Sequence, residues 1–208
     1  MSAPAAATRT FLLSPARCDG IRMGILMRPQ ASFPLARSLR SRAGAPLGDV
    51  FTFASGLYFR GKMAYTRAFG RGLVITPGAG LVDPDRPIGT KELRAWGRVR
   101  VDLADRRYRR PLEHDAQQLA ARLSPGAQVV LLGSIASDKY VELLLEILGE
   151  RLLFPVDFVG RGDMSRGGLM LRAARSGAEL IYGPVQGAIR RGPRPPRLPK
   201  TPAARRSA

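Results

Sequence analysis

The chain has few of the residues that most catalytic and metal-binding motifs require. Cys18 and His114 are the only cysteine and the only histidine among its 208 residues. A single cysteine excludes an intramolecular disulfide and a multi-cysteine zinc or iron–sulfur cluster, and a single histidine excludes every motif that needs two. We therefore predict no metal site, and the sequence leaves any cofactor unidentified.

Long hydrophobic runs are also absent. No stretch of about eighteen residues is free of charge, and the first ten residues lack a basic region followed by an apolar run. We therefore predict a cytoplasmic protein with no membrane partner. The chain is 45% hydrophobic and 24% charged, which is typical of a globular protein, and its length suits one domain. The sequence does not indicate an oligomeric state.

Acidic residues are scarce, since 16 of them face 34 basic residues, and the net charge is +18. Most of the excess lies near the ends: +6 in residues 1–48 and +7 in residues 187–208, against +5 in residues 49–186. Clustered basic charge is typical of proteins that bind nucleic acid, because they release counterions from phosphates. Only four basic residues are lysines, however, and a GC-rich coding sequence would produce the same skew. Both explanations stay open.

The composition changes along the chain and predicts its organisation. Residues 1–9 and the proline-rich basic tail, residues 187–208, have too few apolar side chains to offset the entropy of ordering and are predicted to be disordered. Residues 10–186 are predicted to form a single α/β domain. Within it, residues 28–48 combine Pro, Gly and Arg and are predicted to be a loop-rich insertion with a short helix.

Short apolar runs alternate with helical patterns in the middle of the chain. Runs bounded by Gly, Pro or Ser predict strands over residues 10–14, 49–54, 72–76, 128–133 and 179–182, with a weaker one over 152–155. Apolar residues at helical spacing predict helices over residues 112–123, 141–148 and 166–175, with Ser137, Asp163 and Ser165 as candidate caps. The alternation predicts a three-layer α/β/α domain with a mostly parallel sheet of five or six strands.

This architecture predicts where a ligand binds. Ligands of open α/β sheets bind beyond the carboxyl ends of the strands, and polar or glycine-rich loops follow the predicted strands there. In the loop of residues 133–140, helix capping and exposure on the surface are an alternative explanation for the polar residues. Cys18 is more often a small packed side chain than a nucleophile, but Arg17 and Arg22 beside it are expected to lower the pKa of its thiol. The candidate ligand-binding residues of these loops are Arg17, Cys18, Gly78, Gly80, Gly133, Ser134 and Lys139.

The segment GRGDMSRGG, residues 160–168, precedes a predicted helix. Its glycines permit close backbone approach, and its polar side chains could bind an anion at the helix start. The spacing matches neither a Walker loop nor the dinucleotide fingerprint. A tight turn in which Asp163 caps the helix is the alternative. The candidate ligand-binding residues here are Gly160, Arg161, Ser165 and Arg166.

Three carboxylates are candidate catalytic residues. Asp83 and Asp85 flank Pro84, and neighbouring carboxylates shift each other's pKa as acid/base catalysis requires. A proline-stiffened Asx turn explains the same pattern. Asp163, in the glycine-rich segment, is the third candidate.

Two stretches of the chain carry a resemblance to a known family. Residues 56–65 (GLYFRGKMAY) and 73–85 (LVITPGAGLVDPD) resemble an uncharacterised family of small bacterial and phage α/β domains linked to deazaguanine modification of DNA and tRNA. That family is distantly similar in fold to uracil-DNA glycosylases. The resemblance spans residues 11–171 and implies a nucleobase, nucleotide or nucleic acid as partner. Tyr58, Phe59 or Tyr65 could offer a stacking surface for bases, and Tyr58 is therefore a candidate ligand-binding residue. Residues 76–79 (TPGA) replace the family's Ser-Ala-Lys-His-like tetrad, which removes two reactive groups and leaves binding open.

Two functional hypotheses follow. In the first, the protein binds and processes a nucleobase, nucleotide or modified nucleic acid in a pocket at the carboxyl ends of the strands. This hypothesis predicts that Arg17, Arg161 and Asp163 converge in one pocket. In the second, the protein is a non-catalytic nucleic-acid-binding protein that uses its basic terminal segments, and a flat basic face is expected.

Overall fold

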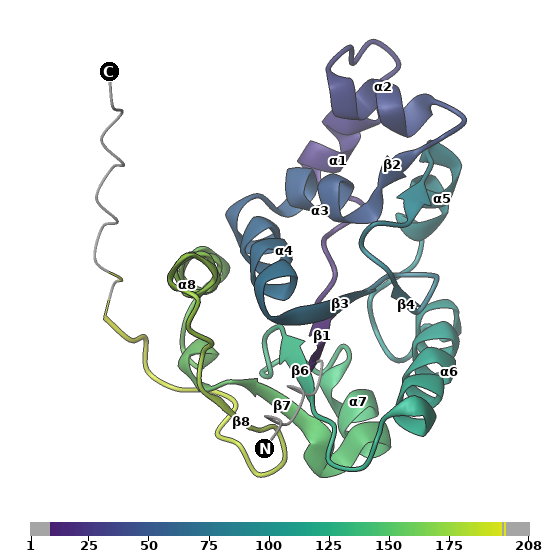
Figure 1. Ribbon diagram of the computed structural model, residues 1–208. Helices are drawn as coiled ribbons and strands as arrows, with labels where there is room; N and C mark the ends of the chain where they lie inside the picture. The colour runs from purple at the N-terminus through teal and green to yellow at the C-terminus, as the bar shows by residue number, and fades with distance from the viewer. Residues whose placement is uncertain (1–8, 197, 199–208) are drawn as a thin grey trace, which may run out of the picture.

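The structure, a computed structural model, describes residues 9–196 and residue 198. Its centre is a six-stranded sheet in the order β4-β3-β1-β6-β7-β8 (Figure 1). The four inner strands are parallel, and the edge strands β4 and β8 run antiparallel to their neighbours. The strands are β1 (Arg9–Leu13), β3 (Gly70–Ile75), β4 (Leu81–Val82), β6 (Val129–Leu132), β7 (Leu152–Pro155) and β8 (Tyr182–Pro184).

Helices cover both faces of the sheet (Figure 1). The core on one face contains side chains of α1 (Ile21–Leu26), α2 (Pro34–Arg40), α3 (Leu47–Ser55), α4 (Leu57–Phe69), α5 (Thr90–Trp96) and α8 (Asp163–Ser176), and α4 packs directly on β1 and β3. The other face packs against α6 (Arg106–Arg122) and α7 (Val141–Leu148). Short 3₁₀ turns, η1 (Gly149–Arg151) and η2 (Val156–Phe158), flank β7, and β2 (Ala45–Pro46) pairs with β5 (Pro87–Ile88) beside α2.

The alternation of side chains along the inner strands makes the two cores. On β1, Phe11 and Leu13 point into the core under α4 and α8, whereas Leu12 points into the core under α6 and α7. On β6, Val130 and Leu132 belong to the first core. All of these residues are fully buried, as expected for a parallel sheet covered on both faces. The predicted three-layer α/β/α architecture is therefore confirmed.

Two of the predicted strands differ from the structure. Residues 49–54 form most of helix α3 rather than a strand, because Leu47, Val50 and Phe51 recur at helical spacing and are all buried against α4 and its neighbours. Glycine at position 56, with φ +60°, then separates α3 from α4. The strand expected over residues 179–182 begins only at Tyr182 and continues to Pro184.

The helix caps also differ from the expectation. Helix α7 follows Tyr140 and α8 follows Gly162, and neither N-cap makes a side-chain capping bond. Gly177 ends α8 in the left-handed conformation, which glycine adopts without steric strain.

Helices α4 and α8 cross at a pair of glycines. A Cβ atom at Gly61 would lie 2.6 Å from the carbonyl oxygen of Gly167, and one at Gly167 would lie 2.6 Å from that of Leu57. The two backbones can approach this closely only because both residues lack a side chain. The crossing brings the first turn of α8 and the middle of α4 together beside the carboxyl end of β1.

Candidate functional site at the carboxyl ends of the strands

A groove opens where the strand order of the sheet changes direction. From β1 the chain moves to β3 on one side and then returns to β6 on the other, so the loops after β1 and β6 diverge. The groove has a volume of about 1140 Å³. We name it the carboxyl-end groove. It is lined by residues 14–23, 54, 55, 58, 77, 96–102, 134, 137, 139, 140 and 163.

A buried lysine lies beneath the floor of this groove. The Lys62 side chain, on α4, is 1% exposed, and its Nζ lies 2.9 Å from the carbonyl oxygen and 2.7 Å from the Oγ of Ser14. Nζ also lies 3.9 Å from the centre of the Tyr58 ring. Burial lowers the pKa of Lys62 to about 7, since the charged form loses its hydration, while the nearby Asp163 carboxylate raises the pKa and the Arg166 guanidinium lowers it. Lys62 is therefore a base that titrates near neutral pH.

Tyr140 and Gly133 complete the surroundings of Ser14. The Tyr140 hydroxyl donates to the carbonyl oxygen of Ser134 over 3.2 Å and also forms a hydrogen bond with Ser14. Burial raises the pKa of Tyr140, so its hydroxyl keeps its proton at neutral pH. A Cβ atom at Gly133 would come within 2.9 Å of the Tyr140 hydroxyl and of Ser14 Cβ. Glycine at this position therefore lets the two hydroxyl groups meet.

The rim of the carboxyl-end groove is mainly basic. Five of its lining residues are basic and three are acidic. Arg17 pairs with Asp19 over 3.1 Å, and both side chains are more than half exposed, so this ion pair adds little stability. Lys139 is exposed at the end of the β6 loop. The basic lining residues are Arg17, Arg22, Arg98, Arg100 and Lys139, and the acidic ones are Asp19, Asp102 and Asp163.

The start of α8 reaches the groove through Asp163. Its side chain is 66% exposed and lies 3.6 Å from the buried Arg166 guanidinium. The Nε of Arg166 donates to the carbonyl oxygen of Phe158 over 3.1 Å, and a second nitrogen lies 3.5 Å from Ser134 Oγ. Arg166 thus joins α8 to the loops after β6 and β7. Its contacts are with the protein, whereas Asp163 is placed for a ligand.

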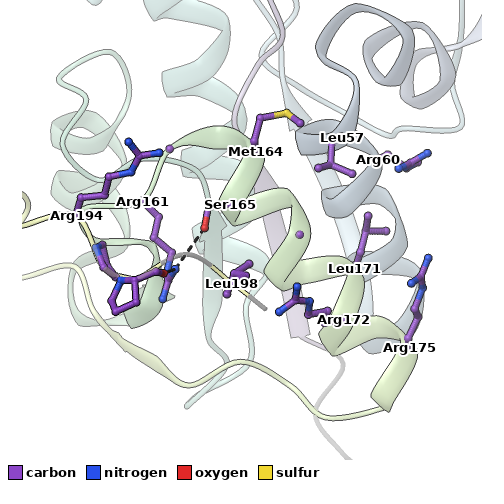
Figure 2. A pocket seen from close by; sticks show the side chains of 14 residues that line it. Leu57, Arg60, Arg161, Met164, Ser165, Leu171, Arg172, Arg175, Arg194 and Leu198 are labelled. Carbon is purple, nitrogen blue, oxygen red and sulfur yellow. Dashed lines mark hydrogen bonds between the residues drawn. The ribbon is translucent and has the colours of Figure 1, made fainter. Parts of the chain in front are cut away.

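Arg161 and Ser165 face a different hollow, which we name the arginine pocket. The pocket has a volume of about 580 Å³ and lies between α4, α8 and residues 194–196 and 198 (Figure 2). Arg161 donates to Ser165 Oγ over 3.3 Å and to the carbonyl oxygen of Pro196 over 3.1 Å. The pocket is lined by Leu57, Arg60, Arg161, Gly162, Met164, Ser165, Gly168, Leu171, Arg172, Arg175, Arg194, Pro195, Pro196 and Leu198.

The structure therefore divides the residues that the pocket hypothesis expected to converge. Arg17 and Asp163 both line the carboxyl-end groove, together with Cys18, Tyr58, Ser134 and Lys139. Arg161 and Ser165 line the arginine pocket instead. The reason is that α8 begins directly after Gly162, so neighbouring residues of its first turn point to opposite sides of the helix.

Cys18 differs from the expectation in its chemistry. Its thiol is buried, and burial together with the negative charge of Asp19 raises its pKa to about 12. The expected lowering of this pKa is wrong, because Arg17 points into solvent and pairs with Asp19 rather than with the sulfur.

Asp83 and Asp85 lie outside the carboxyl-end groove. Strand β4 runs antiparallel to β3 and carries the chain back from the carboxyl end of the sheet. The backbone N–H of Asp85 donates to Asp83 Oδ1 over 2.9 Å, which is an Asx turn. Each carboxylate pairs with an arginine: Asp83 lies 3.8 Å from Arg71, and Asp85 lies 3.3 Å from Arg67.

Three of the glycines named as ligand-binding candidates serve close packing. A Cβ atom at Gly78 would lie 2.9 Å from the Trp96 ring, and one at Gly160 would lie 2.1 Å from the carbonyl oxygen of Pro193. At Gly80, where φ is +61°, it would lie 2.2 Å from Asp115 Oδ2, which accepts a hydrogen bond from Leu81 N–H. These contacts account for the glycines without a ligand.

The site residues predicted from the sequence do not include Ser14, Lys62 and Tyr140. A local signal exists for Lys62, since it is one of four lysines in an arginine-rich chain and follows Tyr58 by one helical turn. Neither feature indicates burial next to Ser14, 48 residues away in the sequence.

Comparisons with protein-family models, with curated proteins and with solved structures give no match to this chain. The resemblance to the deazaguanine-linked family therefore stays a prediction. In the part of the chain that the structure describes, no helix is both long and apolar enough to cross a membrane, and no three His, Cys, Asp or Glu side chains lie together as metal ligands would.

Proposed function

We propose that the carboxyl-end groove binds and processes a small phosphorylated ligand of the nucleotide class. The observation that carries this proposal is the place of the groove. It lies at the point where the strand order reverses, which is where open α/β sheets bind their ligands, and its rim has more basic than acidic residues. A phosphate group suits such a rim, because arginine and lysine bind it with charge-assisted hydrogen bonds.

The lining residues divide into two groups by their position. Arg17, Arg98 and Lys139 are exposed on the rim and are suited to a phosphate. Ser134 is half-buried and Asp163 is exposed at the start of α8, and both offer hydrogen bonds to a base or a sugar. Tyr58 is 5% exposed, so it contributes an edge of the groove floor rather than a stacking surface.

Titration calorimetry of the full chain with nucleoside monophosphates, free nucleobases and inorganic phosphate tests this proposal. We expect one monophosphate to bind more tightly than its base or phosphate alone. Replacing Lys139 or Arg98 with Ala should weaken binding on the order of 10-fold, as expected for the loss of one charge-assisted contact. Lys91→Ala and Arg94→Ala, which change exposed residues of α5 outside the groove, are the matched controls. Equal binding by the groove and control variants would contradict the proposal.

A second function, binding of nucleic acid, is favoured by the arginine pocket. Its fourteen lining residues include five arginines and no acidic residue, and its floor contains the apolar side chains of Leu57, Met164 and Leu171 (Figure 2). Such a surface suits a phosphate backbone. Fluorescence anisotropy with a labelled single-stranded oligonucleotide tests this function. The double variant Arg60→Ala/Arg175→Ala should bind more weakly than wild type, whereas Lys91→Ala/Arg94→Ala should not.

A further inference from the structure

Ser14 and Lys62 form a pair that the nucleotide-binding proposal does not use. Ser14 is the first residue after β1, and its side chain, which is 6% exposed, belongs to the lining of the carboxyl-end groove. Lys62 lies behind it and does not line the groove. A ligand in the groove can therefore reach the Ser14 hydroxyl, while the Lys62 amine is shielded from solvent.

The contacts of the Lys62 amine match those of a neutral base. A neutral amine has two N–H groups and one lone pair. One N–H can donate to the Ser14 carbonyl oxygen at 2.9 Å, and the other can face the Tyr58 ring, whose centre is 3.9 Å away. In the ammonium form Nζ donates to Ser14 Oγ over 2.7 Å, and in the neutral form the lone pair can face the same oxygen and accept its proton. This is the distance at which a general base takes the proton of a nucleophile.

The charged groups around Lys62 leave it without a direct carboxylate partner in the described structure. Asp163 and Arg166 of α8 are the charged groups that act on it, with opposite signs, and Tyr58 and Phe59 of α4 present their rings. Burial disfavours the ammonium form in such surroundings. A lysine with a pKa of about 7 is half deprotonated at that pH and can accept a proton.

We propose that Ser14 is a catalytic nucleophile, that Lys62 is its general base, and that the pair hydrolyses an ester whose acyl group enters the carboxyl-end groove. Serine–lysine pairs are a known solution for acyl transfer, in which one amine serves both as base and as acid. The basic rim of the groove favours a substrate with a negatively charged group. The inference does not rest on nucleotide binding, since it depends only on Ser14, Lys62 and access from the groove.

The reaction proceeds in two balanced steps. Lys62 Nζ takes the Oγ proton while Ser14 Oγ bonds to the ester carbonyl carbon. The bond from this carbon to the alcohol oxygen then breaks. The Lys62 ammonium protonates the departing oxygen, which leaves as the alcohol. Water next bonds to the acyl carbon and gives a proton to Lys62. The bond from this carbon to Ser14 Oγ then breaks, the acid leaves, and the Lys62 ammonium returns the proton to Oγ. The sum is ester plus water to acid plus alcohol, without oxidant or reductant.

Active-site labelling of the full-length protein with a fluorophosphonate tests the inference. We expect one adduct, located on Ser14 by peptide mass spectrometry, and none in the variant Ser14→Ala. Ser41→Ala removes an exposed serine at the end of α2, far from the groove, and is the matched control. Labelling of other residues, or undiminished labelling of Ser14→Ala, would overturn the proposal.

The role of Lys62 is tested by a charge-preserving change and by pH. Lys62→Arg keeps a cation but cannot act as a base at neutral pH, so the labelling rate should fall on the order of 100-fold. Lys91→Arg should leave the rate unchanged. In the wild-type protein the rate should rise through a pH of about 7, and this readout does not depend on whether Lys62→Arg folds. A rate that is independent of pH between 5.5 and 8.5 would overturn the assignment of Lys62.

Substrate class is tested with p-nitrophenyl acetate and bis(p-nitrophenyl) phosphate as probes. We expect Ser14-dependent release of p-nitrophenol from the acetate and an acetyl group on Ser14 during turnover. Release only from the phosphodiester would overturn the acyl assignment. Absence of nucleotide binding in the wild-type protein, with Ser14 still labelled, would count against the proposed function alone, so the two proposals can fail separately.

Discussion

Lys62 is the residue at which the fold and the chemistry of the groove are most closely connected. Its side chain is fully enclosed by α4, α8 and the end of β1, and its pKa is lowered to about 7 because the charged form is poorly hydrated there. In the unfolded chain a lysine has a pKa of about 10.4. Folding at neutral pH therefore releases part of a proton from this one group.

The pH dependence of stability checks this assignment. Between pH 7 and 9 the unfolded state binds more protons at Lys62 than the folded state, so the free energy of unfolding should rise with pH, with a limiting slope of about 1.4 kcal/mol per pH unit. Above about pH 8 ionisation of Cys18 in the unfolded state, where a thiol has a pKa of about 8.5, reduces this rise, because burial holds the folded-state pKa of Cys18 at about 12. Urea unfolding at pH 7, 8 and 9 should show the rise in wild type and in Lys91→Met, but not in Lys62→Met. A rise that persists in Lys62→Met would show that another group causes it.

The reactivity of the Cys18 thiol tests whether this side chain is buried. A thiol with a pKa of about 12 is almost entirely protonated at pH 8, and the protonated form is a poor nucleophile. Iodoacetamide should therefore modify the folded protein at least about 100-fold more slowly than the protein in urea, as measured by intact mass. Equal rates in the two conditions would show that the sulfur is exposed and reactive.

Among the helices and strands, the crossing of α4 and α8 has the largest effect on the carboxyl-end groove. Gly61 and Gly167 allow the two helix backbones to touch, and this contact places Lys62 and Asp163 on the same side of the crossing, near the end of β1. The glycines therefore act on the groove through helix position rather than through contact with a ligand.

Substitution of Gly167 tests this role of the crossing. Gly167→Ala introduces a Cβ atom 2.6 Å from the Leu57 carbonyl oxygen and should destabilise the protein by about 1–3 kcal/mol, as overpacking does. Gly24→Ala, in α1, meets no atom within 4 Å and should be neutral or slightly stabilising, because alanine favours helix. Thermal unfolding of both variants compares the two effects. Similar melting temperatures for the two variants would mean that the helices can separate without cost.

On the scale of the whole molecule, basic charge lies around two separate hollows. The charged residues that line the carboxyl-end groove are both basic and acidic. Those that line the arginine pocket are all basic, and they include Arg194 from the segment after β8. The described part of that segment contacts the domain: the Arg190 side chain pairs with Glu142, and the Pro196 carbonyl oxygen accepts from Arg161.

Truncation after Ile189 separates the two hollows experimentally. It removes Arg194 and the other lining residues of the arginine pocket that follow it, but none that line the carboxyl-end groove. Oligonucleotide affinity should fall, and the dependence of its logarithm on the logarithm of salt concentration should become less steep. Binding of a nucleoside monophosphate and labelling of Ser14 should stay as in the full chain. A loss of all three activities would show that the removed segment supports the domain itself.

The sequence by itself determined the layers of this protein. Apolar runs such as residues 128–133 predict buried strands because burial on both faces needs an unbroken run of apolar side chains, and this requirement is local. The apolar run at residues 49–54 predicts a strand, but a short run of this kind fits either a strand or a helix. Packing against α4 favours the helix that the structure has there. Arg17, Ser134 and Lys139 could be placed near a common edge from strand direction alone.

Only the tertiary structure decided which of these groups can react. Ser14 and Lys62 are 48 residues apart, and neither lies in a motif that predicts their contact. Their 2.7 Å separation results from the packing of α4 against β1, and the low pKa of Lys62 results from its burial between this strand and the helices. Burial and long-range contact depend on how separate elements pack. A residue's own neighbours in the sequence do not specify them.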